Sequence, residues 1–231
     1  MEEHPFSWFS LLPFIGHQPN HVITAIFVLL FLFVLSLYIR RTISHSPNPL
    51  VPAPRFNLPH LIEVAIEFIL GMMEGIIGPH YKKYLPLIGS LFIYIFTCNI
   101  LGIIPGFLPP TDNINTNAAC AILVFVMYNY YGFKEHGWKY IRQFTGPIIW
   151  LAPLMFFIEL FSHLFRPFSL SVRLFGNIFG DHLVLQIFSD LVPLLVPCVF
   201  MVLGMVVSLI QAFIFAALAS VYIALAVSHE H

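Results

Sequence analysis

Long hydrophobic runs alternate with short polar segments along the whole chain. The first run extends from Val22 to Tyr38 and ends at two arginines, Arg40 and Arg41. Two more runs, 85–108 and 113–133, carry no charge, and a turn rich in Pro, Asn and Asp joins them. A helix needs about 20 apolar residues to cross the hydrocarbon core of a bilayer. The three runs therefore predict a first spanning helix within segment 1–57 and a helical hairpin over 84–133.

A different pattern occupies 58–79, where glutamates interrupt the isoleucines and phenylalanines. Glu63, Glu67 and Glu74 recur at i, i+4 and i+11, which places them on one face of a helix. Such a helix lies along the membrane surface or against the protein more often than it spans the bilayer. We therefore expect an amphipathic surface helix over 58–79.

The last third of the chain, 148–228, predicts two much longer helices, over about 148–188 and 192–227. A helix of roughly 36 residues is about 54 Å long, whereas the hydrocarbon core is about 30 Å thick. An unbroken helix would tilt by roughly 55°, far beyond the average of about 20°. Pro193 and Pro197 lie too near the start to shorten the second helix, and Pro153 and Pro167 are candidate kinks in the first. We expect a steeply tilted helical hairpin.

Composition supports lipid as the solvent, because 59% of the residues are hydrophobic and 9% are charged, against about 25% charged residues in soluble domains. The fold class is an all-α polytopic membrane protein, a single membrane domain over 1–231 with about five embedded helices and one surface helix.

The acidic start of the chain favours a spanning first helix over a signal peptide. The net charge of −1 and the lack of a basic cluster argue against nucleic acid.

The basic residues predict the orientation, since cytoplasmic loops carry an excess of Lys and Arg. All of those that flank the spans fall on one side when the N-terminus lies outside and the C-terminus in the cytoplasm. They are Arg40, Arg41, Arg55, Lys82, Lys83, Lys134, Lys139 and Arg142.

Polar residues form a stripe along the predicted helix over 148–188. Glu159, Arg166, Arg173 and Gly180 are spaced by seven, so each step drifts only about 20° around the helix. Beside them fall Ser162, Ser169 and Asn177, and further polar groups follow at Asp181 and His182.

Arginine at bilayer depth costs at least about 3 kcal/mol and cannot lose its charge, so it usually marks an ion path. Arg173, near the middle of the stretch, is the candidate for this role. Arg166 has two interpretations, a channel residue or an interfacial anchor that reaches toward water. Gly176 and Gly180 form a GxxxG pair next to the Arg173 side, which is typical of close helix packing.

The residues SLSVRLFGNIFGDHLVL (169–185) resemble the a subunit of F-type ATP synthases of the bacterial type. The resemblance extends to LIQAFIFAALASVYIALA (209–226) and to FIYIFTCNILGIIP (92–105) with PTDNINTN after it, and so covers nearly the whole chain. It implies a proton channel that couples proton flow to ATP synthesis in the bacterial inner membrane. The implied partners are a ring of c subunits, the b subunits of the peripheral stalk, other ATP synthase subunits and membrane lipid.

The resemblance also implies roles for single residues. Arg173 corresponds to the essential arginine of the family, and Gln211 to the glutamine beside it; Gly176 and Gly180 would contact the ring. The positions expected to line two half-channels are Asn99, Glu159, Ser162, Ser169, Asn177, Asp181, His182, Gln211 and Tyr222. Gly204 and Gly102 depart from the pattern, since relatives often carry protonatable side chains there. Asp181 and His182 are therefore the candidates for the outer proton-accepting group.

Other functions remain as alternatives. A proton-coupled secondary transporter would often show internal repeats, and none is visible. A haem-carrying anchor would need paired histidines on facing helices, whereas His163 and His182 lie on one predicted helix. A structural scaffold would leave Arg173 unexplained. Cys98, Cys120 and Cys198 sit inside apolar runs without ligand spacing, so we expect three buried, inert thiols. We expect no cofactor, no metal site and no ATP site, and no GxxxxGK[ST] loop occurs.

Overall fold

The computed structural model describes residues 20–44, 58–104, 107–138, 140, 152–191 and 195–227. The described segments form α-helices joined by short turns. The α-helices are α1 (Asn20–Ser44), α2 (Leu58–Ile77), α3 (Leu85–Leu101), α4 (Ile114–His136), α6 (Ala152–Leu191) and α7 (Leu195–Val227), and two short 3₁₀ helices are η2 (Tyr81–Lys83) and η3 (Pro110–Asp112). This all-helical architecture confirms the fold class expected from the sequence.

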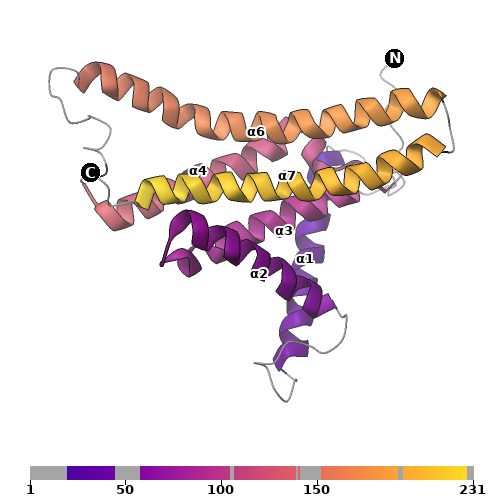
Figure 1. Ribbon diagram of the computed structural model, residues 1–231, viewed down its shortest axis with the longest axis horizontal. Helices are drawn as coiled ribbons and strands as arrows, with labels where there is room; N and C mark the ends of the chain where they lie inside the picture. The colour runs from indigo at the N-terminus through magenta and orange to yellow at the C-terminus, as the bar shows by residue number, and fades with distance from the viewer. Residues whose placement is uncertain are drawn as a thin grey trace.

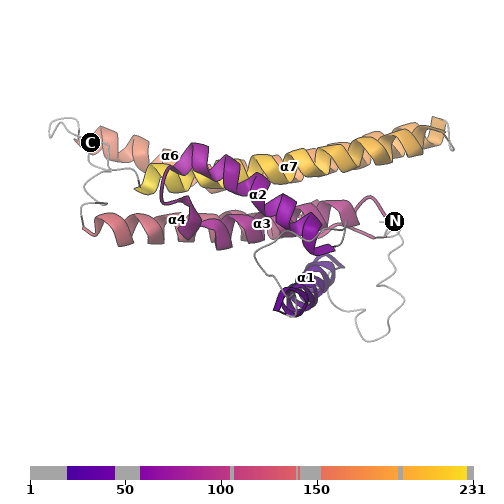
Figure 2. The ribbon, with the colours of Figure 1, turned by 60° about the horizontal axis from the view of Figure 1, so that its bottom comes forward.

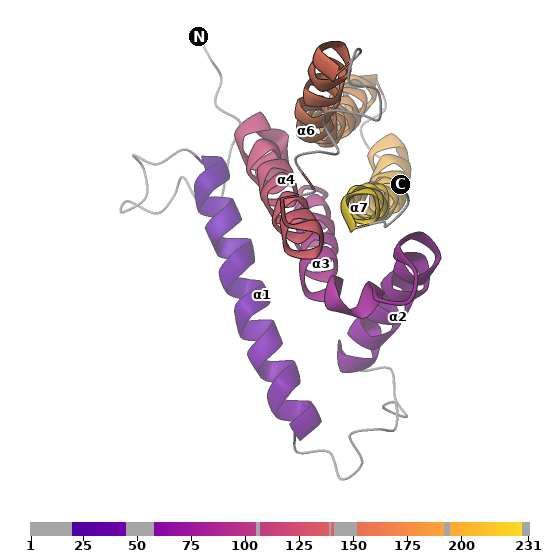
Figure 3. The same ribbon diagram turned by 90° about the vertical axis from the view of Figure 1, so that its left-hand side faces the viewer.

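The helices are arranged in two layers. The long helices α6 and α7 run side by side, and α3 and α4 lie along them in a second layer (Figures 1 and 2). Helix α2 packs against α7, while α1 runs across the direction of the long pair at the edge of the molecule (Figure 3). The hairpin over 84–133 is therefore aligned with the long hairpin in this fold.

Small residues of α7 allow the layers to approach each other. Ala212, Ala216 and Ala219 are completely buried and follow each other at i, i+4 and i+7, so they share one face of the helix. Around them lie large buried side chains such as Tyr84 and Phe215. Small residues at helix interfaces let backbones come close without a cavity.

The two long helices expected over about 148–188 and 192–227 are observed as α6 and α7. Helix α6 has 40 residues and α7 has 33, which correspond to about 60 Å and 50 Å of helix. Helix α6 continues through Pro167, and Figure 1 shows it bowed rather than broken. Pro153 lies in the first turn of α6, where the missing amide hydrogen breaks no helical bond.

The end of α3 was predicted wrongly. We expected the helix to continue to 108, but it ends at Leu101 and the chain turns at Gly102. A Cβ atom at Gly102 would lie 2.7 Å from Cγ of Pro109, so only glycine lets this proline pack back against the helix end. The hydrophobic run thus contains both a helix and the turn after it, which a count of apolar residues does not separate.

Helix α2 has the amphipathic face expected from its glutamates. Ile69 and Met73 are completely buried, and Phe68 packs against Phe213 of α7 with ring centroids 5.2 Å apart. Glu67 and Glu74 are exposed. The helix therefore lies with its apolar side against the protein.

Among the described residues, two helical segments, His21–Thr42 and Cys198–Val227, are long and apolar enough to cross a membrane by length and composition.

The cysteines differ in their surroundings: Cys98 and Cys120 are buried as expected. Cys198 is exposed, which corrects the expectation of three buried thiols. It lies near the start of α7, outside the part of that helix where the buried alanines pack.

Candidate functional site

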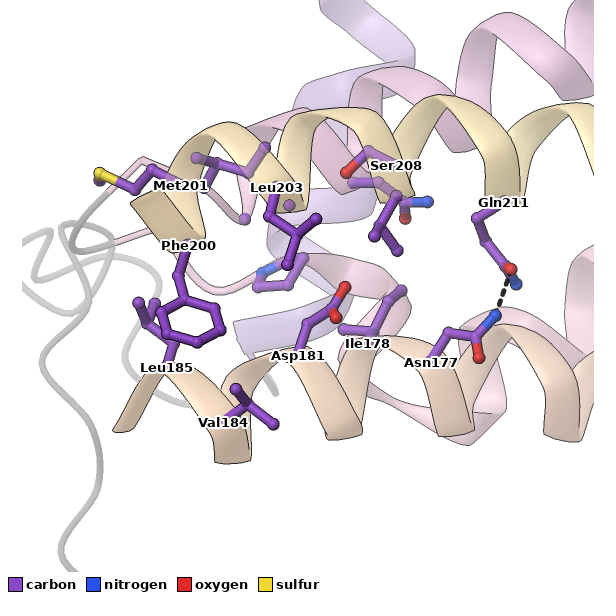
Figure 4. Close-up of a pocket in the computed structure, with 16 residues that line it drawn as sticks. Asn177, Ile178, Asp181, Val184, Leu185, Phe200, Met201, Leu203, Ser208 and Gln211 are labelled. Atoms are coloured by element: carbon purple, nitrogen blue, oxygen red, sulfur yellow. Dashed lines mark hydrogen bonds between the residues drawn. The ribbon is translucent and has the colours of Figure 1, made fainter. Parts of the chain in front are cut away.

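A cavity of about 210 Å³ lies between α6 and α7, next to the end of α3. Its polar lining combines four of the residues expected from the sequence, Asn99, Asn177, Asp181 and Gln211, with Ser208. Figure 4 shows the Asp181 carboxylate and the side chains of Asn177 and Gln211 directed into the space between the two helices. We call this space the glycine-lined cavity, because Gly102 and Gly204 also form its wall.

Hydrogen bonds hold the amides at the wall of the glycine-lined cavity. Asn177 Nδ2 donates to Gln211 Oε1, which joins α6 to α7 (Figure 4). Asn99 Oδ1 accepts from the Thr111 hydroxyl at 2.9 Å, and Asn117 Nδ2 donates to the Thr111 carbonyl at 2.8 Å. Gln211 is buried, at 3% exposure. These hydrogen bonds therefore connect four α-helices, α3, α4, α6 and α7, and η3.

Space in this cavity comes from missing side chains. A Cβ atom at Gly204 would have its nearest neighbours, atoms of Ile103, at 3.9 and 4.0 Å, so the position is open. The glycine therefore leaves room opposite the Asp181 side of the cavity. A cavity of this size has room for several water molecules, since about 30 Å³ is the share of one water.

A second group of polar side chains lies toward the start of α6. The side chain of Arg166 is 19% exposed; its Nη2 lies 4.0 Å from Glu159 Oε1, and its guanidinium carbon lies 5.5 Å from the centre of the Tyr222 ring. Tyr128 packs against Tyr222 and against His163, at centroid distances of 6.1 and 5.0 Å. We call this group the tyrosine cluster; its members are Tyr128, Tyr140, Tyr222, Glu159, His163 and Arg166.

Arg173 lies between the glycine-lined cavity and the tyrosine cluster along α6, and it is exposed. Within the described residues it forms no ion pair. Gly176 and Gly180 lie on the next turns, and a Cβ atom at either would meet nothing within 4 Å. This part of α6 is therefore uncovered in the single chain.

The structure does not bring every predicted residue into the two groups. Ser162 and Ser169 are exposed on α6 and do not line the glycine-lined cavity. His182 belongs to α6, but its side chain lies outside the described residues. Channel-lining roles for these three residues stay predictions.

Several polar residues of the two groups were not expected from the sequence. Ser208 lies three residues before Gln211 and therefore on the same face of α7, a signal that the spacing offered. Asn129, Tyr128 and Tyr140 come from the second hairpin helix and the segment after it, where no sequence pattern marked them. Their importance follows only from the packing of α4 against α6.

Comparison with known proteins places these features in a family. The family model described as "ATP synthase A chain" matches residues 21–224. The protein named "ATP synthase subunit a" of Bdellovibrio bacteriovorus is 41% identical over 98% of this chain and 99% of its own length. The proteins of the same name from Geobacter sulfurreducens and Geotalea daltonii are 46% and 52% identical, over 87% and 72% of this chain and 86% and 73% of their own lengths.

Both the family model and these relatives cover most of the chain, including α3, α4, α6 and α7, which carry the two polar groups. The chain therefore belongs to the ATP synthase A chain family, the membrane-embedded, proton-translocating a subunits of the F-type rotary ATP synthase.

Proposed function

We propose that the glycine-lined cavity and the tyrosine cluster belong to two separate half-channels for protons, with Arg173 between them. The cavity would form the outer half-channel, with Asn99, Asn177, Asp181, His182 and Gln211, and the cluster the inner one, with Glu159, Tyr222, Ser162 and Ser169. The observation that carries this proposal is the position of the exposed Arg173 between two polar groups on one helix. The groups are offset along α6, so a proton cannot pass directly from one to the other.

The uncovered side of α6 is the proposed contact with a ring of c subunits, each carrying a carboxyl group within the membrane. Arg173, Gly176 and Gly180 lie on this side, and the glycines let a neighbouring helix approach the arginine closely. A neutral carboxylic acid tolerates lipid far better than a carboxylate does. A protonated ring site could therefore travel through lipid between the two half-channels.

Arg173 would then release the proton. A fixed cation about 4 Å from a carboxyl group favours its ionised form by about 4 kcal/mol at an effective dielectric constant near 20. Its positive charge also repels protons, which blocks a direct leak between the half-channels. Each charge that crosses the membrane carries about 2.3 kcal/mol per 100 mV, and this energy drives the ring.

The remaining parts of the proposal rest on the basic residues that flank the spans and on the family to which the chain belongs. The N-terminus lies outside and the C-terminus in the cytoplasm of a bacterium, with the chain in the inner membrane. The b subunits of the peripheral stalk hold it still against the ring. ATP is made elsewhere in the complex, because this chain carries no phosphate-binding glycine loop of the GxxxxGK[ST] type.

The test of the central role is Arg173→Ala in inverted membrane vesicles that contain the complete complex. We expect ATP-driven proton pumping to be lost, because no fixed cation then separates the half-channels. Arg40→Ala, at an exposed position near the end of α1, is the control and should pump normally. Normal pumping by the Arg173 variant would reject the proposal.

For the outer half-channel, the variant is Asp181→Ala combined with His182→Ala. We expect a strong loss of proton flux. The complex should still assemble, which is measured by the amount of this chain that co-purifies with the ring. Undiminished flux would remove both residues as candidates for the outer proton acceptor.

A further inference from the structure

A buried histidine joins α6 to α4 in the middle of the tyrosine cluster. His163 is 7% exposed, and its ring lies edge to face against Tyr128 and Phe125 at centroid distances of 5.0 and 5.7 Å. His163 follows Glu159 by four residues and precedes Arg166 by three. These three ionisable side chains therefore share one face of α6, and that face packs toward α4 and α7.

The hydrogen bonds of Asn129 define which nitrogen of His163 carries the proton. Asn129 Nδ2 donates to the Phe125 carbonyl at 2.7 Å, which sets the orientation of the amide. The Asn129 Oδ1 atom then faces the Tyr140 hydroxyl at 3.1 Å and His163 Nε2 at 3.0 Å. Because an amide oxygen only accepts, both partners donate, and His163 carries a hydrogen on Nε2.

This contact constrains the rotation of α6 about its own axis. A helix turns by about 100° per residue, so a small rotation moves all the side chains of one face together. The His163–Asn129 hydrogen bond lies between Glu159 and Arg166 along that face, and the guanidinium of Arg166 is placed over the Tyr222 ring of α7. Loss of the hydrogen bond would therefore displace Glu159 and Arg166 relative to Tyr222.

We propose that His163 is a positioning residue: its hydrogen bond to Asn129 holds Glu159 and Arg166 against Tyr222 at the inner half-channel. The inference rests on the proposed function of the tyrosine cluster. His163 itself carries no proton through the channel. The other ionisable groups around it are Glu159 and Arg166 of α6, Tyr128 of α4, Tyr140 in the segment after α4, and Tyr222 of α7.

The experiment compares His163→Gln with His163→Leu in inverted vesicles that contain the complete complex. Gln presents an N–H near the place of Nε2 but cannot titrate, whereas Leu keeps the volume and loses the donor. ATP-driven pumping is measured over a range of pH on the cytoplasmic side, and each rate is divided by that of the unmodified complex at the same pH. This ratio cancels the pH dependence of ATP hydrolysis.

We expect His163→Gln to match the unmodified complex and His163→Leu to pump about fivefold more slowly, as for one lost hydrogen bond, with an altered dependence on cytoplasmic pH. His80→Leu, at an exposed histidine before η2, is the matched control and should leave the profile unchanged. Asn129→Leu should reproduce the defect of His163→Leu, and the double variant should be no worse than either single one, since both remove one contact.

Three outcomes would overturn the inference. Equal defects in the Gln and Leu variants would make His163 a proton carrier, and normal pumping by His163→Leu would deny it any role. Additive defects of the His163 and Asn129 variants would show that the two act separately. If His163→Leu does not assemble, the comparison of His163→Gln with Asn129→Leu decides the same question.

Glu159→Gln separates this inference from the proposed function. If that variant leaves the dependence on cytoplasmic pH unchanged, the inner half-channel assignment fails. If Glu159→Gln alters the profile while the His163 and Asn129 variants do not, only the positioning role of His163 fails.

Discussion

The two polar groups on α6 are built in opposite ways. The glycine-lined cavity is open at Gly204, which contributes no side chain to its wall, and its amides are held at the edges. The tyrosine cluster is filled by aromatic rings, and its one arginine has both a carboxylate and a ring as partners. One helix therefore carries a space for water at one end and a tightly packed polar network at the other.

The two arginines of α6 show the same contrast. Arg166 is mostly buried among its partners, whereas Arg173 is exposed and forms no ion pair within the described residues. Buried charges in proteins are usually paired, since an unpaired buried charge is very costly. The difference indicates that Arg166 has its partners in this chain, while Arg173 is available for a partner outside it.

Filling the cavity should have the largest effect. Gly204→Phe would place a ring in the space between α6 and α7, so we expect proton pumping to fall by about tenfold or more, equivalent to at least about 1.4 kcal/mol in the barrier. Gly204→Ala is the control, because a Cβ atom there has only ordinary contacts. Pumping is measured as acidification of inverted vesicles per assembled complex. Full activity of the Phe variant would exclude the cavity from the proton path.

The next largest effect is expected from the removal of Arg166. Arg166→Leu leaves Glu159 without its ion pair and Tyr222 without its cation, and we expect thermal unfolding of the purified complex to show a loss of about 2 kcal/mol from this subunit. Arg166→Lys keeps the charge but not the planar guanidinium, so its loss should be smaller. Equal stability of all three proteins would mean that the tyrosine cluster does not depend on Arg166.

A subtler change is Gly132→Ala in α4. The added Cβ atom would lie 2.5 Å from the Tyr140 ring, so the ring must move away from its bond to Asn129. We expect a loss of about 1 kcal/mol, at the low end for overpacking because the ring can swing. Gly71→Ala in α2, where nothing lies within 4 Å, is the matched control. It should be neutral or slightly stabilising, since alanine favours helices.

The smallest effect is expected outside both polar groups. Lys83, in η2, donates to Glu135 at the end of α4, and this contact raises the pKa of Lys83 from its usual 10.5. A raised pKa in the folded state means that the stabilisation is present below pH 10.5 and is lost as the pH rises through the higher, folded-state pKa. Lys83→Gln should leave pumping unchanged and lower the melting temperature slightly, and only at low salt. A defect in pumping would give this exposed pair an unexpected role.

The sequence predicted the helices better than the contacts between them. Runs of apolar residues were sufficient to predict the two long helices. The seven-residue spacing of Glu159, Arg166 and Arg173 predicted one polar face, whereas Arg166 lies against Tyr222 of α7 and Arg173 is exposed. The end of α3 was missed because the turn at Gly102 is as apolar as the helix before it. The contact of His163 with Asn129 was missed, because Asn129 lies 34 residues away on another helix and no local pattern connects the two.

The two-layer arrangement of the long helices also has a mechanical consequence. In the proposed function, a turning ring would push sideways on the uncovered face of α6, and the stator would have to transmit that torque without yielding. Leu170, Leu174 and Ile178 form a buried row along the opposite side of α6, within the core shared with α4 and α7. A sideways force on α6 is therefore distributed over several helical turns, and no single contact has to resist all of it.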